Sequence, residues 1–184
     1  MKTHLDQLKL GAFTRFVRRK MDDKRLYGFA LESNHKLTLL ALVNDFQPNG
    51  FCVIRNQDVS RYVVFDDPSY VECRALRLLG VTVPPKPEID IASFATVAIS
   101  AATQFPLIVL NCELHRPHVC WVGRYRRHTK RKLTVDSIDP SAVWDGTEAL
   151  RFRDLTMIGF GASYESGLWL VAQENLRAAK TGAN

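Results

Sequence analysis

The chain has 184 residues, of which 46% are hydrophobic and 24% are charged, and its formal net charge is +6. This is the composition of an ordinary globular protein with enough residues to bury a hydrophobic core. The longest uncharged stretch, residues 91–112, carries several polar side chains and Pro106, so we interpret it as a buried helix followed by a buried strand and not as a membrane span.

The opening sequence MKTHLDQLKL has no apolar stretch of signal-peptide length, and neither end carries a lipidation motif. Four cysteines in such a chain are expected to be reduced and mostly buried thiols. We therefore expect a cytoplasmic protein.

The first half predicts a short helix over residues 4–10, five strands and a second helix. The strands are rich in β-branched and aromatic residues and are separated by turn-forming residues: AFTRFVRR (12–19), RLYGFALES (25–33), KLTLLALV (36–43), GFCVIR (50–55) and VSRYVVF (59–65). The third strand is too apolar to alternate with solvent, so we expect both of its faces to be buried. In the helix that follows, Asp67 is expected at the N-cap and Gly80 just past the end.

Three prolines in VTVPPKPEID (81–90) favour an extended connection between two halves. The second half repeats the order: a helix over 90–102, then strands PLIVLNCE (106–113), HVCWVGRY (118–125), KLTVDSID (132–139), EALRF (148–152) and LTMIGF (155–160). In the closing helix, apolar Tyr164, Leu168, Val171 and Leu176 recur near helical spacing.

The two halves are related by a weak internal repeat. The tripeptide KLT opens residues 36–43 and residues 132–139, which are 96 residues apart, and the same offset places Gly50 on Gly146, Arg55 on Arg151 and Asp58 on Asp154. Because the strands and turns also fall in register, we interpret the chain as a duplicated unit. The predicted domains are residues 1–80, a proline-rich linker over 81–88, and residues 89–184.

A short helix followed by five strongly bent strands resembles the Sm-like small β-barrel, and the tandem arrangement resembles uncharacterised bacterial proteins built from two such units. The run DLTMIGFGASYESGLWLVA (154–172) is similar to the closing segment of that group. The resemblance implies a mainly β protein with flanking helices (α+β) that consists of two tandem five-stranded barrels. It also implies RNA binding and assembly into homo-oligomers. The family's RNA-contacting loop pattern is replaced here by SNH in one half and RRHTKR in the other.

The most unusual feature is RYRRHTKRK, residues 124–132, which we expect to form a hairpin loop. It holds six of the 25 Lys and Arg residues, and the other 19 balance the 19 Asp and Glu residues, so the whole surplus charge lies there. Guanidinium and ammonium groups bind phosphates, and aromatic rings stack on bases. The candidate nucleic-acid-binding residues are Arg124, Tyr125, Arg126, Arg127, His128, Lys130, Arg131 and Lys132.

Cys112, His115, His118 and Cys120 combine residue types that bind zinc, but their spacing matches no standard arrangement, so we expect no metal. Asp136, Asp139, Asp145 and Glu148 crowd one region, and we interpret Asp139 and Asp145 as turn residues. The chain lacks a glycine-rich phosphate loop and the common hydrolase motifs. We therefore expect no enzymatic activity and no cofactor.

Two functions remain open from the sequence. The first is a binding module that presents the basic loop of the second half to RNA or another polyanion. The second is a protein-interaction adaptor, or an immunity-type inhibitor of another bacterial protein, that docks on an acidic surface. The sequence does not distinguish these partners, and it fixes neither a nucleotide preference nor the oligomeric state.

Overall fold

The computed structural model describes residue 5, residues 8–18, residue 21 and residues 25–181. Its strands are β1 Phe13–Val17, β2 Leu26–Ser33, β3 Leu37–Asn44, β4 Gln47–Arg55, β5 Arg61–Val64, β6 Ile108–Asn111, β7 Cys120–His128, β8 Lys132–Ile138, β9 Trp144–Arg151 and β10 Met157–Phe160. The helices are α1 Val71–Leu78, α2 Phe94–Gln104 and α3 Ser163–Thr181, with a 3₁₀ turn, η1, at Asn56–Asp58. The expectation of a mainly β protein is confirmed.

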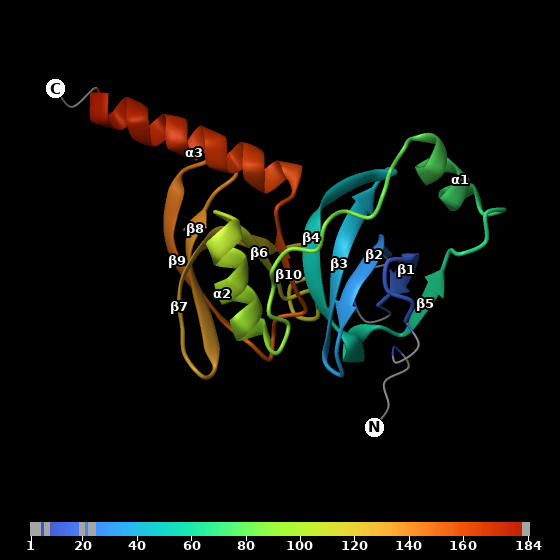
Figure 1. Cartoon of the computed structure of the whole chain (residues 1–184). Helices are drawn as coiled ribbons and strands as arrows, with labels where there is room; N and C mark the ends of the chain where they lie inside the picture. The colour runs from blue at the N-terminus through green and yellow to red at the C-terminus, as the bar shows by residue number, and fades with distance from the viewer. Residues whose placement is uncertain (1–4, 6–7, 19–20, 22–24, 182–184) are drawn as a thin grey trace.

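The strands form one open antiparallel sheet in the order β5-β1-β2-β3-β4-β10-β6-β7-β8-β9 (Figure 1). The predicted pair of closed five-stranded barrels is therefore wrong. The order β5-β1-β2-β3-β4 of the first half recurs as β10-β6-β7-β8-β9 in the second, but neither set closes on itself. The free edge of β4 pairs instead with β10, with Ile54 opposite Met157 and Phe51 opposite Phe160. This pairing satisfies the backbone groups that barrel closure would have satisfied within each half.

A glycine in the second strand of each half allows close backbone approach. A Cβ atom on Gly28 would collide with the carbonyl of Ala41 in β3, and one on Gly123 would collide with the carbonyl of Asp136 in β8. Any larger residue would therefore push the second and third strands apart. The two glycines are equivalent in the strand order, which shows the repeat at the level of backbone packing.

The largest core cluster contains residues from both halves. Leu39 and Val53 of the first half pack in it with Leu110, Val135 and Ile158 of the second. All residues of β3 are buried except Leu42, which is half-buried, and Asn44, which is exposed. One face of the strand contacts this cluster, and the other contacts Phe16 and its neighbours. The expectation that both faces of β3 are buried is confirmed: one face packs against the second half and the other packs within the first half.

A buried ion pair also joins the halves. The Arg18 guanidinium donates to both carboxylate oxygens of Glu113 at 2.6 and 2.7 Å, and the hydroxyl of Thr156 donates to the same carboxylate at 2.9 Å. Both ionic side chains are almost completely buried. A two-point pair of this kind fixes the orientation of two surfaces, since a shift of either leaves a buried charge without its partner.

The helices follow the predictions in part. Helix α2 begins after Ser93, whose hydroxyl accepts from the Thr96 amide while the Thr96 hydroxyl accepts from the Ser93 amide. Helix α1 begins later than predicted, because Asp67 accepts a hydrogen bond from the Ser69 amide in a local turn and Tyr70 is the N-cap. Its predicted end is confirmed at Gly80, which has a φ of 69°.

Helix α3 packs on the sheet through a different face from the predicted one. Leu168 is buried as expected, but Tyr164, Val171 and Leu176 are exposed, and Glu165 and Ala172 are buried instead. Figure 1 shows α3 lying across one end of β7, β8 and β9, with its C-terminal half beyond the sheet. Of the predicted helix over residues 4–10, residues 4, 6 and 7 lie outside the described residues, and residues 5 and 8–10 are not helical.

Candidate nucleic-acid interface

The basic segment 124–132 is mostly strand and not loop. Strand β7 continues to His128 and β8 begins at Lys132, so that only residues 129–131 form the turn. The Thr129 hydroxyl accepts from the amides of Arg131 and Lys132 at 3.3 and 3.1 Å, and the Thr129 amide donates to the Lys132 carbonyl at 2.8 Å. This short turn satisfies its own backbone groups and leaves the Lys130, Arg131 and Lys132 side chains exposed.

Two of the predicted arginines are partly neutralised. The guanidinium groups of Arg124 and Arg126 lie 3.3 and 3.0 Å from the two carboxylate oxygens of Asp136. Arg124 also lies over the Trp144 ring, 5.1 Å from its centroid. Their charges are therefore partly satisfied within the protein, and the expectation of six unopposed cations in one loop is corrected by these contacts.

The predicted aromatic pair is also engaged. The Tyr125 hydroxyl lies 2.8 Å from Nδ1 of His128, and the Tyr125 ring packs against the main core cluster. Arg127, by contrast, is exposed in β7. The role of all eight predicted residues in binding nucleic acid stays a prediction. The structure separates four engaged residues of β7, which are Arg124, Tyr125, Arg126 and His128, from exposed Arg127 and the exposed group at the turn, Lys130, Arg131 and Lys132.

The exposed group meets a second basic turn that follows β9. Lys132 pairs with Arg151 across β8 and β9, and the Phe152 amide donates to the Arg131 carbonyl at 3.0 Å. The two turns together line a cavity of about 780 Å³. We call its lining residues the basic surface: Lys130, Arg131, Lys132, Arg151, Phe152 and Arg153.

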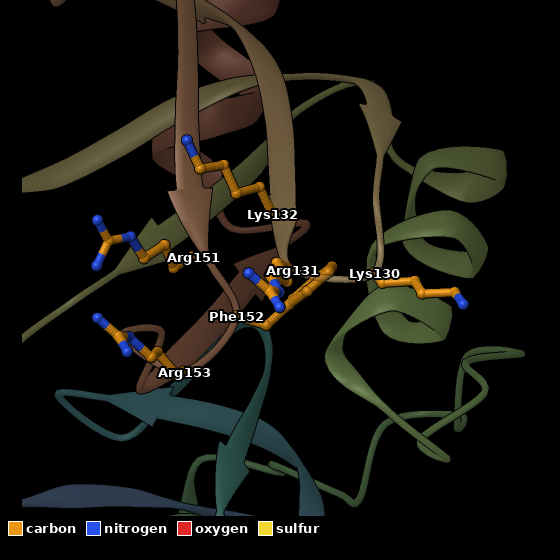
Figure 2. Close-up of a pocket in the computed structure, with 6 residues that line it drawn as sticks. All are labelled: Lys130, Arg131, Lys132, Arg151, Phe152 and Arg153. Atoms are coloured by element: carbon orange, nitrogen blue, oxygen red, sulfur yellow. The ribbon is translucent and has the colours of Figure 1, made fainter.

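Figure 2 shows how these side chains lie. Lys132, Arg151 and Arg153 extend to one side of the two turns, whereas Lys130 extends to the opposite side, toward α2. Arg131 and Phe152 lie between them. The cations therefore extend away on either side of Phe152, whose ring is partly buried and packs against the main core cluster.

The charge of the basic surface is largely unopposed. No Asp or Glu lines the cavity, and within the described residues Lys130, Arg131, Lys132 and Arg151 have no carboxylate within ion-pair distance. Only Arg153 has an acidic neighbour, Asp154, at 3.5 Å. Four neighbouring cations without acids repel one another, so an anionic ligand that bridges them would be stabilised.

The sequence reasoning missed Arg151, Phe152 and Arg153. Their signal was present in two forms: the alternation Arg-Phe-Arg at the end of a strand, and the repeat that places Arg55 on Arg151. Only strand pairing shows that the turn after β9 lies beside the turn after β7.

The cysteine and histidine segment is not assembled into a metal site. Among the described residues, no group of three or more His, Cys, Asp and Glu side chains is placed to hold an ion. Cys112 is buried while Cys120 is exposed, and burial raises the pKa of the Cys112 thiol to about 11. His115 instead lies 3.7 Å from Asp154.

Two of the four predicted carboxylates, Asp136 and Asp139, have structural contacts, whereas Glu148 and Asp145, which was predicted as a turn residue, lie exposed in β9. Asp136 binds the two arginines of β7, and Asp139 accepts from the amides of Ser141 and Val143 at 2.9 Å each. The interpretation of Asp139 as a turn residue is confirmed by these bonds.

Comparison of the chain with protein-family models, with curated proteins and with solved structures finds no match. Within the part of the chain that the structure describes, no helix has the length and apolar character needed to cross a bilayer.

Proposed function

We propose that this protein is a non-enzymatic module that binds single-stranded RNA through the basic surface. The observation that carries the proposal is the group of four cations, Lys130, Arg131, Lys132 and Arg151, which two adjacent turns bring together without an acidic partner among the described residues. Phosphates of a nucleic-acid strand would bridge such cations and release bound counterions.

Phe152 favours a single strand over a duplex. Its ring is partly buried and lies among the cations, where an unpaired base could stack on it. In a duplex the bases are already stacked, so the ring would contribute nothing. An acidic protein would satisfy the cations as well, but it would gain nothing specific from a flat ring at the centre of the surface.

The test is the affinity of a fluorescent single-stranded RNA for the intact protein, measured by fluorescence anisotropy. Replacement of Arg131 and Arg151 by Ala removes two exposed guanidinium groups and leaves their backbone hydrogen bonds in place. We expect a loss of roughly thirtyfold or more, since the two charge-assisted contacts contribute on the order of 1–3 kcal/mol each.

The matched control is the double variant Arg74→Ala/Arg77→Ala. These arginines are also exposed, and Figure 1 shows α1 at the opposite end of the molecule from β8 and β9. The control loses the same charge and is expected to bind within about twofold of the unmodified protein. Equal losses in both variants, or saturable binding of an acidic protein with no RNA binding, would overturn the proposal.

A further inference from the structure

A second basic cavity lies where the two halves meet. It has a volume of about 840 Å³ and is formed by the turn before β3, the end of β4, the start of α2 and the turn after β7. It shares Lys130 and Phe152 with the basic surface and continues it toward the first half. We call it the junction cavity. Its volume is within the range of about 300–1,000 Å³ that small-molecule sites have.

The wall of the junction cavity combines apolar and cationic groups. Leu37, Phe94 and Phe152 provide apolar surface, and the first two are more than nine-tenths buried. Lys36 and Lys130 are exposed and, among the described residues, have no acidic partner. No Asp or Glu lines this cavity.

Other groups in the wall differ in what they offer an anion. Arg55 is held by Asp58 at 2.6 Å and by the carbonyl of Arg153 at 3.0 Å, so its position is fixed but its charge is partly neutralised. Ala95 lies in the first turn of α2, where the helix dipole adds positive potential. His128 uses Nδ1 in its contact with the Tyr125 hydroxyl, which leaves Nε2 as the ring nitrogen for a ligand.

The internal repeat relates the two cavities. The offset of 96 residues places Lys36 on Lys132 and Arg55 on Arg151, and each pair lines its own cavity. The two halves therefore present the same two residue types at the same ends of equivalent strands, although the register differs by one residue: Arg55 is opposite Leu37, and Arg151 is opposite Lys132. The junction cavity differs because α2 closes one side of it and supplies the buried Phe94 ring.

From this geometry we infer that the junction cavity binds one nucleoside phosphate, with the base against Phe94, Phe152 and Leu37 and the phosphate on Lys36 and Lys130. A purely apolar ligand would leave the cations without a partner, and inorganic phosphate alone would leave the apolar wall exposed to water. The inference rests on the proposed function if the nucleotide belongs to a bound RNA strand. A free nucleotide has the same chemistry and would occupy the same site.

The test uses uridine and adenosine 5′-monophosphate as probes of the intact protein. Titration is followed by amide chemical shifts in nuclear magnetic resonance spectra. We expect saturable shifts that include Lys36, Ala95 and Thr129, with weaker binding of inorganic phosphate and of the unphosphorylated nucleosides. Lys36→Ala should weaken mononucleotide binding about tenfold, because it removes a charge-assisted contact.

Arg74→Ala is the matched control, since Arg74 is exposed in α1 and lines neither the basic surface nor the junction cavity. It should leave mononucleotide affinity within about twofold. Absence of saturable shifts at the cavity, or equal weakening by both variants, would overturn the inference even if RNA binds elsewhere on the basic surface. Conversely, mononucleotide binding that depends on Lys36 in a protein without RNA affinity would support the inference and overturn the proposed function.

A competition experiment identifies the source of the nucleotide. If a mononucleotide displaces a bound RNA oligonucleotide from the unmodified protein but not from Lys36→Ala, a nucleotide of the strand occupies the junction cavity. If the mononucleotide binds without displacing RNA, a free nucleotide is the natural occupant. Both results support a nucleotide site in the junction cavity. They differ only in whether the nucleotide belongs to an RNA strand or is free.

Discussion

Glu165, in the first turn of α3, is a buried carboxylate with an unsatisfied atom. Its side-chain oxygen Oε2 is buried and has no hydrogen-bond partner among the described residues. Burial raises the pKa of the Glu165 carboxyl above its ordinary value. Because the sequence pattern of an acidic residue near a helix start predicts exposure, only the packing of α3 on the sheet reveals this burial.

The raised pKa of Glu165 predicts a specific pH dependence of stability. The folded protein holds this proton more tightly than the unfolded chain, so the contribution of Glu165 to stability is present at low pH and is lost as pH rises through the raised pKa. We expect Glu165→Gln to have about the same free energy of unfolding as the unmodified protein near pH 5. At pH 8 the variant should be more stable, by on the order of 1 kcal/mol.

Urea denaturation of both proteins at the two pH values measures this difference. The decisive result is how the difference in free energy of unfolding between Glu165→Gln and the unmodified protein changes with pH, since all other groups titrate equally in both proteins. A difference that stays constant from pH 5 to pH 8 would show that the Glu165 carboxyl is solvated.

At the scale of secondary structure, strand positions were largely predictable and strand partners were not. All ten strands overlap the stretches expected from β-branched and aromatic residues, because the turns between them are marked by Gly, Asn and Asp. Helix starts were less predictable: Asp67 forms a local turn instead of capping α1. Residues 126–128 were misread as loop, because charged side chains in β7 point to solvent while its backbone pairs with β8.

A glycine in the second strand of the second half and a glycine in helix α3 predict opposite effects for two Gly→Ala substitutions. Gly123→Ala should destabilise the protein by about 1–3 kcal/mol, because the new methyl group meets the Asp136 carbonyl. Gly167→Ala in the exposed face of α3 should stabilise it by up to about 1 kcal/mol, since its methyl group meets open space and alanine favours helix.

Thermal unfolding of the two variants, followed by circular dichroism, measures the predicted loss of stability in Gly123→Ala and the predicted gain in Gly167→Ala. Gly167→Ala also serves as the control for a general effect of the substitution. A neutral Gly123→Ala variant would mean that β7 and β8 are not packed as closely as the backbone indicates.

At the scale of the whole molecule, the pairing of β4 with β10 makes one sheet of two similar units. The sequence repeat indicated the units but could not show how their edges meet, because backbone hydrogen bonding across an edge depends little on side-chain identity. The same pairing brings the turns after β7 and β9 close to the first half and so creates the junction cavity. No local sequence motif predicts this cavity, because its wall comes from both halves.

The shared core predicts that the halves unfold together. Ile158 of β10 is fully buried and packs in the cluster that contains Leu39 and Val53 of the first half. Ile158→Ala should destabilise the protein by about 2–5 kcal/mol. Hydrogen exchange should show equal loss of protection for amides of β3 and β8. Loss confined to β6, β7 and β8 would indicate two independent units.

The salt dependence of RNA binding tests the account most directly, since each phosphate contact with a single strand lowers the slope of log K against log salt by about 0.7. If the cations of the basic surface contact phosphates, the unmodified protein should give a slope of about −3, and Arg131→Ala/Arg151→Ala should give a slope less steep by about 1.4. A slope near zero, or one that the double substitution leaves unchanged, would contradict RNA binding at the basic surface.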